Sequence, residues 1–82
     1  INDNYTVLTT DRIIKITAFG KTITLPTAVG NTGREFIIDN ASAGDVTVDG
    51  NASETIEGSL TQIVPSSSAM VIYSDGSNFR II

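Results

Sequence analysis

Apolar and polar residues alternate at every step in several short segments of this chain, and turn-forming residues separate those segments. In Lys21–Pro26 and in Asp45–Gly50 the alternation has the period of a β-strand, whose successive side chains point to opposite faces. β-Branched Ile, Val and Thr dominate these segments, and no window has the three- and four-residue apolar spacing of a helix. The chain is therefore predicted to be all-β.

Turn signals divide the chain into nine predicted strands. Pro26 and Pro65 end two of them because proline cannot donate to a β-ladder, and Asp75-Gly76 is a strong hairpin signal between the last two. The predicted strands are 5–8, 12–18, 22–25, 35–40, 45–49, 55–57, 60–64, 69–74 and 78–82. They predict a small antiparallel domain, sandwich- or prism-like, of about eight or nine short strands.

The sequence also contains a weak internal echo. Phe36–Val48 and Met70–Ile81 each have an apolar strand, a turn and a second alternating strand. Solenoids need about three such units, so two copies favour a recurring hairpin.

The length of the chain limits how it can be stabilised. Its 82 residues, 1–82, make one small domain, and it begins with Ile1, so we expect it to be a piece of a longer protein. A domain of this size buries only about 60–65 % of its unfolded surface. The chain has no Cys and no His, which excludes disulfides and the commonest metal ligands. Association is the expected source of further stability.

Several predicted strands carry apolar residues on both faces, whereas a free-standing sheet with one wet face should alternate cleanly. Either a second sheet of the same domain or other copies of the chain can cover the second face, and we favour other copies. The candidate intersubunit contacts on this second face are Ile13, Ile37, Val71 and Ile82.

Composition argues against several classes of function. No His is present as a base, no Ser-x-x-Lys spacing occurs, and most of the Asp residues border turns, where they usually bond the local backbone. Net charge is −4 and the five Lys and Arg are not clustered, so no nucleic-acid footprint is present. No apolar run approaches the ~20 residues of a membrane span. We predict a non-enzymatic domain with no cofactor, no nucleic-acid partner and no membrane insertion.

Two ligand hypotheses remain. Asp45 and Asp49 fall on one outward face, which suits a hard cation, although an acidic edge that discourages strand pairing has the same appearance. Sugar recognition combines an aromatic face with short polar side chains. The candidate glycan contacts are Tyr73, Asp75, Ser77, Asn78 and Phe79. The structural alternative places Phe79 in the core and Tyr73 at an interface with its hydroxyl wet.

Several segments together carry a family resemblance: Tyr5–Leu8, Thr22–Pro26, Asn31–Asn40, Val46–Val48, Ser53–Gly58 and the chain end Ser74–Ile82. They resemble the carboxy-terminal domains of bacteriophage tail fibres and tailspikes, which often close with a Ser-Asp-Gly turn and an aromatic residue. Phe79 stands where Trp is more usual. The resemblance implies a homotrimeric β-structured tip on a virion, which binds host-surface glycan or locks three fibre chains together. It implies no catalytic residue.

Three functions follow as hypotheses. The first is a receptor-binding head, in which three weak glycan sites act together. The second is a purely structural trimerisation and capping module. The third is an accessory carbohydrate-binding module of a polysaccharide-degrading enzyme.

Overall fold

The computed structural model describes residues 1–82 and contains eight strands and no helix, which confirms the all-β prediction. The strands are β1 (Tyr5–Thr6), β2 (Ile13–Ile16), β3 (Thr22–Thr24), β4 (Glu35–Asn40), β5 (Val46–Asp49), β6 (Thr61–Val64), β7 (Ser68–Ser74) and β8 (Phe79–Ile81). The predicted strand at 55–57 does not form. Instead, Ile56 makes only isolated bridges, to Ser59 and to Phe79.

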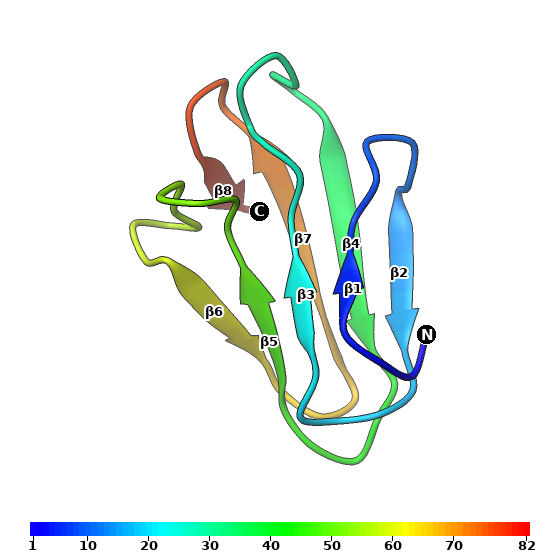
Figure 1. Ribbon diagram of the computed structural model, residues 1–82. Helices are drawn as coiled ribbons and strands as arrows, with labels where there is room; N and C mark the ends of the chain where they lie inside the picture. Colours follow the sequence, from blue (N-terminus) through cyan, green and yellow to red (C-terminus); the bar gives the residue numbers. More distant parts are fainter.

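The strands form two four-stranded sheets, in the orders β1-β3-β5-β6 and β2-β4-β7-β8 (Figure 1). The prediction of an antiparallel domain is only partly right, because both sheets are mixed. The pairs β1–β3, β3–β5 and β2–β4 are parallel, and β5–β6, β4–β7 and β7–β8 are antiparallel. Parallel neighbours need a crossover connection, and here each crossover passes through a strand of the other sheet.

The first five strands therefore wind alternately through the two sheets. This winding corrects the interpretation of the internal echo as a recurring hairpin. In the second copy, β7 and β8 do pair as a hairpin, but in the first copy β4 and β5 belong to different sheets. Period-two alternation is the same in both arrangements, so it cannot distinguish them.

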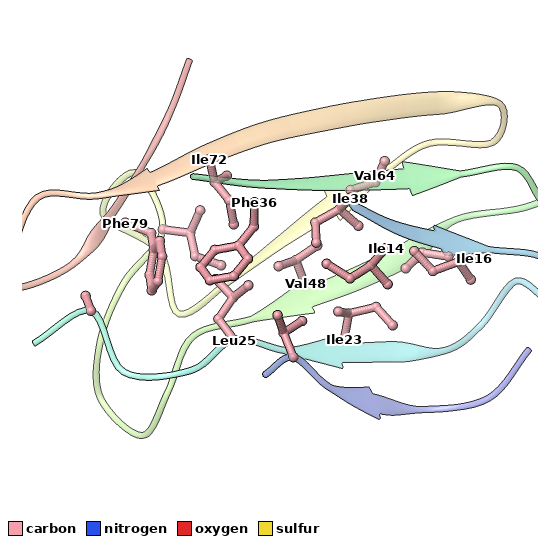
Figure 2. Close-up of a cluster of buried hydrophobic side chains, with 14 residues drawn as sticks. Ile14, Ile16, Ile23, Leu25, Phe36, Ile38, Val48, Val64, Ile72 and Phe79 are labelled. Atoms are coloured by element: carbon pink, nitrogen blue, oxygen red, sulfur yellow. The ribbon is translucent and has the colours of Figure 1, made fainter. Parts of the chain in front are cut away.

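The hydrophobic core lies between the two sheets, with side chains from both (Figure 2). Within it the rings of Phe36 and Phe79 meet at a tilt, with centroids 6.1 Å apart. Full burial of a Val, Leu, Ile or Phe side chain contributes about 1.5–3 kcal/mol. The core residues are Val7, Ile14, Ile16, Ile23, Leu25, Ala28, Phe36, Ile38, Val46, Val48, Ile56, Val64, Ile72 and Phe79.

One buried amide joins the end of β4 to the loops around it. The Asn40 Nδ2 donates to the carbonyls of Gly44 at 2.8 Å, Val64 at 2.8 Å and Pro65 at 3.1 Å. Its Oδ1 accepts from the backbone N–H and the hydroxyl of Ser42, at 3.0 and 2.6 Å. No buried side-chain polar atom in the structure lacks a partner, so this network is fully satisfied.

Candidate functional site

The four predicted second-face residues lie in one row across the β2-β4-β7-β8 sheet. Ile13 pairs with Ile37, and Ile37 pairs with Val71. Beyond the end of β8, the N–H of Ile82 donates to the Val71 carbonyl at 2.9 Å, which continues the row. Ile13 and Ile82 are 62 % and 70 % exposed, and Ile37 and Val71 are half-buried. We call these four residues the apolar row.

Charged residues of both signs border the apolar row. On one side Lys15 pairs with Asp39 in the parallel ladder of β2 and β4. On the other side Glu35, Tyr73 and Arg80 form the neighbouring row across β4, β7 and β8. The outer face of this sheet thus has an apolar centre and a charge-balanced rim, the usual anatomy of a protein interface.

The outer face of the other sheet is chemically different. Threonines dominate it, and the only exposed large apolar residue among its paired positions is Ile63, 49 % exposed. Its two rows are Thr22–Thr47–Ile63 and Thr6–Thr24–Asp49–Thr61. Only the β2-β4-β7-β8 sheet therefore presents a continuous apolar row to solvent.

The candidate cation ligands do not form a metal centre in the structure. Asp49 lies among the threonines of this outer face and Asp45 is exposed immediately before β5. No group of three or more Asp, Glu, His or Cys side chains that could hold a metal ion occurs.

The candidate glycan contacts lie around the predicted β7–β8 hairpin, and most of their polar groups shape the turn. The Asp75 Oδ1 accepts the N–H groups of Ser77 at 3.0 Å and Asn78 at 2.8 Å, which lowers the pKa of Asp75. The Asn78 Oδ1 accepts the N–H of Thr55 at 2.9 Å. The Asp75 contacts fix the turn, and the Asn78 contact ties the hairpin to the loop after β5.

The aromatic members of the hairpin set differ in accessibility. Phe79 is fully buried against Phe36, so its ring offers no face to a ligand and we assign it to the core. Tyr73 is half-buried on the outer sheet face, and Ser77 is exposed. A depression of about 340 Å³ beside the hairpin is lined by Thr55, Glu57, Gly58, Asp75, Asn78, Phe79 and Arg80. Tyr73 and Ser77 are outside it.

The β1–β2, β3–β4 and β7–β8 connections gather at one end of the molecule (Figure 1). A larger depression at this end is lined by residues of the first two connections and the start of β4. It has a volume of about 640 Å³, and no hydrophobic residue lines it. The lining residues are Thr10, Asp11, Arg12, Gly30, Asn31, Thr32, Gly33, Arg34 and Glu35. We call this depression the polar cleft. Sequence reasoning missed it because its residues lie in two separate loops whose composition is that of ordinary turns.

One carboxylate in the polar cleft is fixed by two strong contacts. The Asp11 Oδ2 accepts the hydroxyl of Tyr5 at 2.6 Å and the N–H of Leu8 at 2.9 Å. The hydrogen bond from Tyr5, and then that from Leu8, lowers the pKa of Asp11. The same hydrogen bond, together with desolvation, raises the pKa of Tyr5. The Asp11 side chain is thus held as a carboxylate in one orientation.

Comparison with protein-family models, curated proteins and solved structures finds no match to this chain. The structure contains no helix of the length and hydropathy that would cross a membrane. The two outer faces and the polar cleft are therefore the features on which a functional proposal can be built.

Proposed function

We propose that this domain is a non-catalytic assembly module that packs against other copies of itself through the apolar row. In the proposal it forms the homotrimeric tip of a phage tail fibre or tailspike on the virion, where it holds three chains together and presents its loops to host-surface glycan. The observation that carries the proposal is the alignment of Ile13, Ile37, Val71 and Ile82 in one row.

The size and chemistry of this face suit association. A specific interface takes about 800 Å² from each partner, which is roughly a fifth of the 4312 Å² surface of this chain. An apolar centre with charges at the rim gives affinity from burial, and the rim charges select the register of the partner.

The resemblance to tail-fibre tips supports three copies rather than two. In a closed trimer each interface is heterologous, and the rotation around a threefold axis closes the ring. Three sheets facing that axis make a three-sided prism and leave no apolar row exposed. An open arrangement would leave one row uncovered at each end and continue to recruit copies.

A purely structural trimerisation and capping module is the second candidate. It uses the same row and differs only in having no ligand. The burial of Phe79 and the internal hydrogen bonds of Asp75 and Asn78 favour it over ligand binding at the hairpin. An accessory carbohydrate-binding module has less support, because no aromatic side chain lies fully exposed on either sheet face.

A matched pair of charge insertions tests the proposal. Ile37→Asp places a carboxylate at the centre of the apolar row, and Thr47→Asp places one at the corresponding central strand of the other sheet. In a sedimentation experiment we expect the Ile37→Asp variant to be a folded monomer. The Thr47→Asp variant should form the same oligomer as the wild type. Equal oligomerisation of both variants would show that the apolar row is not the interface.

A further inference from the structure

The polar cleft has the groups of a binding site and is held open by contacts within the chain. Arg34 reaches from one loop to the other, and its Nη1 donates to the Thr9 carbonyl at 2.7 Å. The loop that carries it is anchored by the N–H of Gly33, which donates to the Ser74 carbonyl at 2.8 Å. Because the loops are already fixed, a ligand would lose little affinity to their ordering.

Several polar groups in the polar cleft have capacity left for a ligand. The contact between Arg12 and Glu35 is long, 3.5 Å, and the two side chains are 64 % and 41 % exposed. Arg34 forms no salt bridge, so most of its donors are free. Both hydrogen bonds to Asp11 use its Oδ2, and the other oxygen accepts none. The hydroxyls of Thr10 and Thr32 make no hydrogen bond within the protein.

The charges in the polar cleft balance. Two guanidinium groups, Arg12 and Arg34, face two carboxylates, Asp11 and Glu35, so the formal charge of the lining is zero. An anion would be attracted by the first pair and repelled by the second, and the chain as a whole carries −4. A hydroxyl group both donates and accepts, so it can bond a carboxylate and a guanidinium at once.

We propose that the polar cleft binds a neutral saccharide through neighbouring hydroxyl groups. Arg12 and Arg34 donate to the sugar oxygens, and Asp11 and Glu35 accept from the sugar hydroxyls. The polar cleft has no aromatic face on which a sugar ring can stack, so a single site is weak, and several copies in one assembly raise the avidity. This inference rests on the proposed role in glycan binding, and it places the contact in the polar cleft rather than at the hairpin.

Amide NMR titration of the 82-residue chain with the methyl glycosides of glucose, galactose and mannose tests the inference. We expect at least one to shift the resonances of 10–12 and 30–35, with a dissociation constant on the order of 1–10 mM. Arg12→Gln should weaken binding about tenfold, as expected for loss of a charged hydrogen-bond donor. Lys21→Gln, which removes the same charge outside both the polar cleft and the apolar row, should leave sugar binding unchanged. Glucuronate should bind no more tightly than the glucoside.

Three results would overturn the inference. The first is the absence of shifts in the polar cleft with all three glycosides at about 50 mM, well above the expected constant. The second is loss of binding in Arg80→Gln, beside the hairpin, with full binding in Arg12→Gln. The third is binding of glucuronate about tenfold tighter than that of the glucoside, which would identify an anion site. Light scattering on the same samples keeps the two proposals apart, since a monomer that binds sugar contradicts only the assembly, and an oligomer that binds none contradicts only the cleft.

Discussion

Ile37 and Val71 pair directly across the two central strands of the β2-β4-β7-β8 sheet, and both side chains lie on its solvent-facing side. In the same strands Phe36 pairs with Ile72, and both are fully buried in the core. One strand pair thus carries apolar contacts on both of its faces. The inner pair stabilises the fold, and the outer pair is the centre of the proposed interface.

Replacing a valine of the apolar row by threonine should weaken association with little effect on folding. Val71→Thr keeps the shape and β propensity of the side chain and replaces a methyl by a hydroxyl that the interface must desolvate. We expect the free energy of association to weaken by about 1 kcal/mol for each contact between copies. Analytical ultracentrifugation over a concentration series measures this change. Ile63→Thr, on the outer face of the other sheet, is the control and should leave the association constant unchanged.

Removing the buried Asn40 amide should strongly destabilise the fold. Asn40→Leu removes the amide donor to the carbonyls of Gly44, Val64 and Pro65 and the acceptor of the Ser42 N–H and hydroxyl. We expect a loss of about 2–4 kcal/mol in the free energy of unfolding in urea. The exposed Asn4 makes one contact, accepting the N–H of Thr22, and Asn4→Leu should cost about 1 kcal/mol or less. Equal losses in the two variants would rule out a special role for the Asn40 network.

The two phenylalanines Phe79 and Phe19 should respond very differently to truncation. Phe79 is fully buried against Phe36, so Phe79→Ala should cost about 3–5 kcal/mol of stability. Phe19 is 61 % exposed on a turn, so Phe19→Ala should cost about 1 kcal/mol or less. Thermal unfolding of both variants measures the difference. If the Phe79→Ala protein were as stable as the wild type, the assignment of this ring to the core would be wrong. Phe79 would then again be a candidate ligand contact.

Stability should fall at both acidic and alkaline pH through one hydrogen bond. The folded-state pKa of Asp11 is lowered, so its contribution is present above the unfolded pKa and is lost as pH falls through the folded value. The folded-state pKa of Tyr5 is raised, so its contribution is present below the unfolded pKa of about 10 and is lost as pH rises through the folded value.

Urea unfolding of wild type and Asp11→Asn across pH measures this effect. The substitution should flatten the fall in stability below about pH 4 and also the fall above about pH 10. Asp45→Asn removes a carboxylate that makes no side-chain hydrogen bond, and it controls for the change in net charge. If the Asp11→Asn variant lost as much stability as the wild type above about pH 10, this result would contradict the coupling of Asp11 to Tyr5.

Alternation in the sequence predicts eight of the nine expected strands within a few residues of their observed positions, and the faces on which their residues fall. The residues Ile13, Ile37, Val71 and Ile82 were identified by their opposition to core neighbours, and the structure places them in one row. The alignment itself is not visible in the sequence, because it depends on the register between strands. The segment around Ile56 illustrates a limit, since a short apolar–polar pattern there yields only isolated bridges.

The polar cleft and the parallel pairing both depend on long-range arrangement. Arg12 and Arg34 line one cleft only because successive strands enter opposite sheets, which brings the two loops to one end of the molecule. Local pattern contains no signal for that winding, since parallel and antiparallel strands alternate in the same way. The role of Phe79 has the same origin, because the face on which it falls is decided by the register of the β7–β8 hairpin.

The mass of the 82-residue chain in solution, measured by light scattering at micromolar concentration, tests the assembly most directly. A particle of three copies of the 8.7 kDa chain is the predicted result. A stable single copy that remains soluble with its apolar row exposed would contradict it.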